Sequence, residues 1–163
     1  MKKISGLITL LFVFILALSA LPAVTEAGNK WSRTHPEINL THIFQGEINR
    51  RGKPTGFHSR PGGIDPRNAR LVKIMSPPDR SGVYTARVEI RDLKTGRWKR
   101  KFSSFFPDSM DRKEVIEAVL HAWKHRRRGM KNPWRGPSGH GFLIQGYTTR
   151  RGGINTAFPI YRK

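Results

Sequence analysis

Residues 83–105 carry the pattern that most restricts the fold of this chain. From Val83 to Arg91, apolar and polar side chains alternate, which is the period of a half-buried β-strand. The turn-forming run 92–96 follows, and a second alternating run covers residues 97–105. Two such runs joined by a short turn predict an antiparallel β-hairpin.

One helix is predicted after the hairpin. Asp111 and Glu114 have the spacing of a capping box, and apolar residues recur at helical intervals from Val115 to Trp123. Gly129 is a natural end for this helix. Further strands are predicted at 71–75, 141–149 and 154–161. The expected fold is α+β, a twisted antiparallel β-sheet with helices packed on one side.

The N-terminal residues 1–27 have the order of a secretory signal peptide. A positively charged start precedes an apolar run from Leu7 to Leu18, and Thr25 and Ala27 supply the small residues of a cleavage site. A retained membrane anchor is the alternative, but the run is shorter than the ~20 residues of a membrane span. We therefore expect cleavage and secretion to the extracellular space. Residues 28–38 form a polar lead-in, and 39–163 form the expected domain.

The charge of the chain restricts its partners. It has 31 Lys and Arg against 11 Asp and Glu, a net charge of +20. This favours a polyanionic partner, which is nucleic acid, an anionic membrane surface or an acidic protein. Candidate phosphate contacts lie at 97–101 and 126–128, although the second cluster also suits a solvated helix end. The absence of cysteine excludes a disulfide framework and a cysteine nucleophile.

Two histidines flank a long, basic loop that is rich in Gly, Pro and Arg. His42 and His58 stand at the borders of this region, which covers roughly residues 46–70. A neutral and a protonated imidazole are what metal-free RNA cleavage needs as base and acid. Loop histidines held by backbone groups are an equally good interpretation. For His121 and His125, four residues apart on the helix, solvated side chains are favoured over a metal site.

Several segments, in the same order, resemble the bacterial EndoU nuclease domain. They are His42–Glu47, Gly56–Gly63, Val83–Val88, Ser104–Asp108, Gly136–Gly139 and Ile154–Pro159, and the resemblance covers roughly residues 38–160. It implies a twisted antiparallel sheet related in outline to barnase-like toxins. It also implies an endoribonuclease that prefers to cut at uridylates and leaves 2′,3′-cyclic phosphate and 5′-hydroxyl ends. The resemblance implies no required cofactor, and stimulation by manganese is compatible with the family.

The resemblance also implies roles for individual residues. His42 and His58 match the two catalytic histidines, without an assignment of acid and base. Thr156 matches the residue that contacts the uracil edge. Phe158 stands where many relatives have a Tyr, so base stacking is retained while a hydroxyl contact is not, and Tyr161 lies three residues further on.

The catalytic lysine of the family is expected at Lys73, with Lys53 and Lys101 as the next candidates. An ordinary surface lysine is an equal interpretation of Lys73. Arg60 is a candidate for substrate binding, although Arg60 and Glu47 are better suited to holding the loop. Trp134 lies in a basic segment predicted as loop and is a candidate for base stacking.

The sequence thus predicts a monomeric, secreted RNA-binding ribonuclease. An antibacterial toxin is a further interpretation, with the same chemistry and a different purpose. A toxin of this kind implies an acidic immunity protein as a partner. No stable membrane insertion is expected after signal cleavage. The alternative is a non-catalytic cationic secreted protein that binds nucleic acid or an anionic envelope.

Overall fold

The computed structural model describes residues 30–127, 129 and 132–163. The predicted signal peptide and Arg128 lie outside the described residues. Among the described residues, none of the helices is long and apolar enough to cross a membrane.

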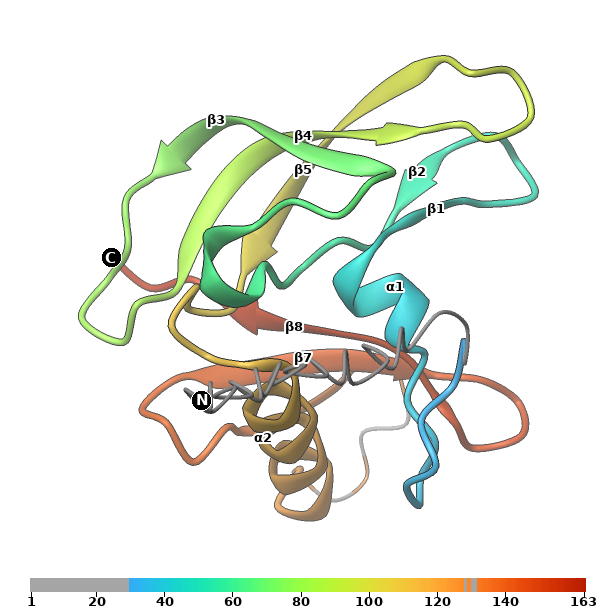
Figure 1. Ribbon diagram of the computed structural model, residues 1–163. Coiled ribbons are helices and arrows are strands. Elements are labelled where there is room, and N and C mark those ends of the chain that lie inside the picture. Colours follow the sequence, from blue (N-terminus) through green and yellow to red (C-terminus); the bar gives the residue numbers. More distant parts are fainter. Residues whose placement is uncertain (1–29, 128, 130–131) are drawn as a thin grey trace, which may run out of the picture.

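The strands form two antiparallel three-stranded sheets and a short ribbon (Figure 1). In the first sheet the order is β3-β4-β5, with strands Ala69–Ser76, Tyr84–Arg91 and Trp98–Phe105. In the second sheet the order is β6-β7-β8, with strands Trp134–Pro137, Leu143–Thr148 and Ile154–Ile160. The ribbon pairs β1, Glu47–Ile48, with β2, Pro54–Thr55. The α+β class is confirmed, and the predicted strands divide between separate sheets.

The predicted hairpin and helix are both present. Strands β4 and β5 pair in regular register from Tyr84 and Phe105 to Arg91 and Trp98. Helix α2 covers Arg112–Lys124, and Asp111 and Glu114 form both bonds of the capping box. Its buried residues are Val115, Ala118, Val119 and Ala122. This apolar face packs on the second sheet, below β7 in Figure 1.

Trp134 is not in a basic loop, as the sequence predicted, but in strand β6, where it is 0% exposed. Its ring contacts Trp123 of α2 at 5.4 Å between ring centroids. Gly146 of β7 leaves room for the indole, because a Cβ at Gly146 would lie 2.3 Å from the ring. Trp134 is therefore a core residue and is not available to stack on a base.

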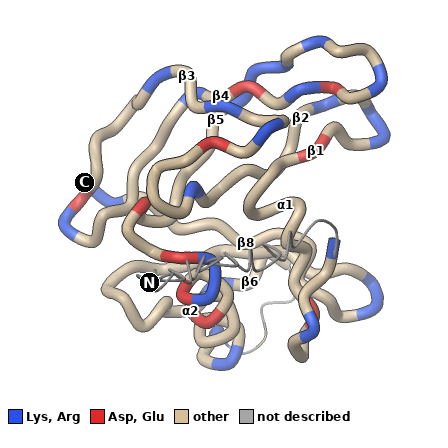
Figure 2. The backbone as a smooth tube through the Cα atoms, in the orientation of Figure 1, with Lys and Arg blue, Asp and Glu red and all other residues tan. Residues whose placement is uncertain are grey.

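Each sheet has its own buried apolar cluster. One lies between α2, the first helix α1 (Leu40–Phe44) and the second sheet, and the other lies under β3-β4-β5. The basic residues gather mainly on the first sheet and the ribbon, as the blue segments at the β4–β5 turn in Figure 2 show. The segment between α1 and β3 runs between the two clusters and carries the ribbon and a short 3₁₀ turn, Pro61–Gly63.

Candidate active site

The two histidines meet because their two segments are bonded to each other. The backbone N–H groups of Phe57 and His58 donate to the carbonyl oxygens of His42 and Ile43, each at 2.7 Å. Gly56 makes this approach possible, because a Cβ there would lie 2.2 Å from the His42 oxygen. Phe57 next to it has a positive φ of 62°, a conformation that strains a non-glycine residue.

The imidazole rings of His42 and His58 lie 6.1 Å apart between centroids, and each residue is 8% exposed. Nδ1 of His42 lies 3.2 Å from Oε1 of Glu47. The hydrogen bond from His42, followed by the neighbouring Lys30, lowers the pKa of Glu47 to about 2. Glu47 is thus a permanent negative charge beside the His42 ring.

His58 is held in one tautomer. Its Nδ1 lies 3.1 Å from the carbonyl oxygen of Ser104 and 2.9 Å from Oγ of Ser103. Because a carbonyl only accepts, Nδ1 carries the proton and the neutral ring has its lone pair at Nε2. Burial, then the charges of Lys101 and His42, lower the pKa of His58 well below its usual value. Nε2 has no hydrogen bond to the part of the chain that the structure describes.

Among the three candidate lysines, Lys101 lies beside the histidines. Its Nζ donates to the carbonyl oxygen of Gly56 at 2.8 Å and to Oγ of Ser103 at 3.0 Å. Burial lowers the pKa of Lys101 to about 8. Lys73 is exposed on β3, which β4 separates from the strand of Lys101, and Lys53 is exposed in the β1–β2 turn.

The predicted base-binding residues lie on and after β8. The ring of Phe158 stacks on His58 with 5.2 Å between centroids. Thr156, two residues earlier on the strand, has a buried Oγ1 without a hydrogen-bond partner in the described chain. Phe158 and Tyr161 line a solvent-open cavity of about 600 Å³ together with Ser104 of β5. We call this cavity the β5–β8 groove.

Arg60 holds the loop after His58. Its guanidinium donates to Asp65 at 2.7 Å, to Asp108 at 3.1 Å, to the Tyr84 hydroxyl at 3.3 Å, and to the carbonyl oxygen of Gly63. These contacts occupy the side chain within the protein. The geometry therefore supports the loop-holding interpretation of Arg60 over substrate binding.

Sequence reasoning missed Ser103, which is 2% exposed and lies at the centre of the cluster. Its hydroxyl donates to the carbonyl oxygen of Phe57 at 2.7 Å and accepts from Lys101. The available signal was the alternation of β5, which puts residues 101, 103 and 105 on the inner face. A lysine and a serine on an inward face of a strand indicate a polar cluster.

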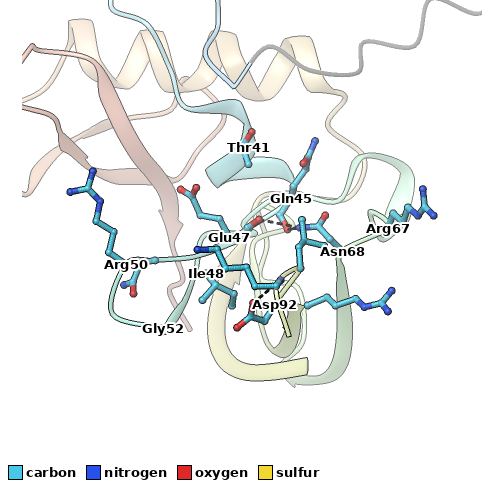
Figure 3. A pocket seen from close by; sticks show the side chains of 14 residues that line it. Thr41, Gln45, Glu47, Ile48, Arg50, Gly52, Arg67, Asn68 and Asp92 are labelled. Atoms are coloured by element: carbon cyan, nitrogen blue, oxygen red, sulfur yellow. Dashed lines mark hydrogen bonds between the residues drawn. The ribbon is translucent and has the colours of Figure 1, made fainter. Parts of the chain in front are cut away.

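A second cavity, of about 880 Å³, lies next to the ribbon (Figure 3). Its wall combines residues 45–50 with Arg67, Asn68 and the β4–β5 turn. Asn68 closes one side by donating to the carbonyl oxygens of Gln45 and Gly46 at 3.3 Å and 3.2 Å. Neither His42 nor His58 lines this cavity or the β5–β8 groove. The groove adjoins His58 through Ser104 and Phe158, which both contact its ring.

The exposed pair His121 and His125 has ring centroids 4.2 Å apart, and both Nδ1 atoms face backbone carbonyl oxygens. In the described part of the chain no group of three or more His, Asp or Glu side chains has the arrangement of a metal site.

Comparison with known proteins adds to this geometry. The family model described as bacterial EndoU nuclease matches residues 36–161. A protein of Bacillus cereus named Toxin is 32% identical over 126 residues, which are 74% of this chain and 22% of that protein. The chain thus spans about a fifth of the length of this curated relative. No solved structure gives a significant match.

Proposed function

The chain belongs to the bacterial EndoU nuclease family, and we propose that it cleaves RNA by attack of a ribose 2′-hydroxyl on the adjacent phosphate. The observation that carries the proposal is the pair of unlike imidazoles, one facing a carboxylate and one kept neutral, 6.1 Å apart. Unlike environments at two titratable groups are typical of an acid and a base.

In the proposed reaction His58 is the base and His42 is the acid. Nε2 of His58 takes the proton of the 2′-hydroxyl, and the 2′-oxygen forms a bond to phosphorus. The bond from phosphorus to the 5′-oxygen breaks, and an imidazolium at His42 donates its proton to that oxygen. Glu47 is the counter-ion of this imidazolium. The products are a 2′,3′-cyclic phosphate and a 5′-hydroxyl.

Lys101 is proposed to stabilise the negative charge that develops on the phosphate oxygens. It lies in the same hydrogen-bonded cluster as His58, through the Ser103 hydroxyl. Its partial burial strengthens its electrostatic effect, because the charge is screened less by water. We therefore propose Lys101, and not Lys73, as the catalytic lysine.

Uridylate preference is proposed to come from Thr156 and Phe158. The Thr156 hydroxyl is a buried donor and acceptor whose partner the edge of a base supplies. Phe158 supplies a π-face on which that base stacks.

The test uses two matched RNA oligonucleotides with a single uridine. The purified protein should cleave the first at that uridine and leave a cyclic phosphate, with EDTA or with manganese present. It should bind but not cleave the second, in which the uridine alone is 2′-deoxy. Cleavage of the second would refute the mechanism. Salt-sensitive binding of both RNA and DNA without cleavage would support the non-catalytic alternative.

The name of the Bacillus cereus relative supports a toxin role, and the order of the first 27 residues supports secretion. We propose that the protein is secreted and acts on the RNA of competing cells. The producer then needs an acidic protein that covers the basic site. The test is whether cytosolic expression of residues 28–163 arrests growth while a His58→Asn variant does not.

A further inference from the structure

The outer face of β3-β4-β5 presents a row of three side chains that the site described above does not use. The strand register places Lys73 of β3 opposite Arg87 of β4, and Arg87 opposite Phe102 of β5. Phe102 is 61% exposed, which is unusual for a phenylalanine in the middle of a strand. The row therefore combines an accessible aromatic ring with two exposed cations.

The cations of this row differ from those of the neighbouring row. The neighbouring row consists of Arg70, Glu89 and Arg100, which the strand register places side by side. Glu89 is paired with Arg70 at 2.6 Å and with Arg100 at 2.8 Å, so these charges are largely compensated. Lys73 and Arg87 have no ion pair with a carboxylate in the described part of the chain. Uncompensated cations beside an exposed ring match the pattern of single-stranded nucleic-acid sites, in which bases stack and phosphates track cations.

The row is continuous with the proposed active site. Phe102 lines the β5–β8 groove with Ser104 and Phe158, and these two residues contact His58. Phe102 and Ser104 are two residues apart on one strand, which is about 7 Å. This places the ring within reach of the nucleotide next to the one at the histidines. Exposed Arg135, bonded to Gln145 at 2.6 Å, lines the same groove.

We propose that Phe102, Arg87 and Lys73 form a second nucleotide subsite for single-stranded RNA. The base that flanks the cleaved uridylate stacks on Phe102, and the phosphates beyond it contact Arg87 and Lys73. This subsite rests on the proposed ribonuclease function and extends it to substrate length. It gives Lys73 a role in binding the RNA backbone, at a distance from the reacting phosphate.

The test combines two substrates with three variants. The first substrate is a hexanucleotide with one uridine, and the second has abasic residues on both sides of that uridine. On the first, Phe102→Ala should lower kcat/KM about tenfold, the effect of losing one stacked base. On the abasic substrate Phe102→Ala should equal the wild type. Phe102→Tyr should keep the full rate on both.

Leu93→Ala is the matched control, because Leu93 is 79% exposed at the β4–β5 turn, outside the groove. It should leave both rates unchanged. Equal losses of Phe102→Ala on both substrates, or no loss on either, would overturn the subsite. Binding of uncleavable 2′-deoxyuridine versions, followed by fluorescence anisotropy, separates the two proposals. If the wild type cleaves nothing, the ribonuclease proposal fails, and the same Phe102→Ala comparison of affinities still decides on the subsite.

Discussion

The Nζ atom of Lys101 donates a hydrogen bond to the carbonyl oxygen of Gly56, 2.8 Å away. This contact joins the middle of β5 to the loop that carries His58. It fixes the ammonium group on the same side of the sheet as both histidines. A single contact thus links the strand, the loop and the proposed reacting groups.

Replacing Lys101 by Met should abolish most activity and leave the fold intact. We expect a loss of kcat/KM of about 100-fold or more, because a cation close to the phosphate is removed. Met fills a similar volume, so the thermal unfolding temperature should change little. Lys73→Met is the control and should lose far less on a minimal substrate. The reverse ranking of the two variants would return the catalytic role to Lys73.

Loss of the Lys101 proton should lower the rate above about pH 8, in addition to the fall caused by loss of the proton from the proposed acid. Burial lowers the pKa of this ammonium to about 8, so the cation is present below that pH and is lost above it. In Lys101→Arg the guanidinium stays charged, and the descending limb of the kcat/KM profile should move to higher pH. An alkaline limb that is identical in the wild type and in Lys101→Arg would show that another group causes it.

The strand pattern predicted β4 and β5 well, because alternation survives wherever one face is buried. It also put Lys101 on the face opposite to Phe102. What it could not show is that this inner face packs against the histidine loop, which depends on contacts between residues 45 apart. Lys73 also lies in a predicted strand, so the strand pattern alone did not distinguish it from Lys101, and the sequence favoured Lys73.

Strand β6 was missed for a different reason. Its four residues include Gly136 and Pro137, which do not favour strands, and no alternation is visible in so short a run. The strand exists because it pairs with β7 and because Trp134 fills the space beside α2. Tertiary packing thus overrides the local preference, and the predicted base-stacking tryptophan becomes part of the core.

Thr156→Val should separate base recognition from stability. The variant keeps the shape of the side chain and removes a buried hydroxyl that has no partner in the described chain. Stability should be unchanged or higher, since the Thr156 hydroxyl gives up its hydrogen bonds to water on folding without gaining a partner in the described chain. Cleavage at uridine should fall about tenfold, the effect of one missing hydrogen bond to the base. Thr156→Ser should retain the preference. Undiminished cleavage by Thr156→Val would exclude the hydroxyl from recognition.

His58 should make the protein less stable as the pH falls from 7.5 to 5. Burial holds the pKa of His58 in the folded state well below 6.5, so below pH 6.5 the unfolded chain takes up a proton that the folded chain does not. The free energy of unfolding then falls by up to about 1.4 kcal/mol per pH unit. Glu47 adds nothing in this range, because its stabilising effect is lost only below pH 4.5.

The measurement is urea unfolding of the wild type and of His58→Asn, whose amide N–H can replace the Nδ1 donor. The difference in unfolding free energy between the two should shift in favour of the variant as the pH is lowered. Groups far from residue 58 contribute equally to both proteins and cancel in the difference. A difference that is constant between pH 7.5 and 5 would mean that folding does not shift the pKa of His58.

Gly56→Ala should disturb the approach of the His42 segment to the His58 segment. Its cost in unfolding free energy should exceed the cost of the left-handed backbone conformation at Gly56 alone. Gly56 has a φ of 75°, and Gly152, in the β7–β8 turn, has a φ of 88°. A Cβ at Gly152 meets open space, whereas at Gly56 it would lie 2.2 Å from the His42 oxygen. Gly152→Ala should therefore cost only the left-handed strain, roughly 1–2 kcal/mol. Gly56→Ala should cost at least twice that amount in unfolding free energy.

The residual folded protein of Gly56→Ala should cleave RNA far more slowly, because the carbonyl of His42 must move away from the loop. Equal destabilisation of the two variants would show that this close approach is not what holds His42 and His58 together.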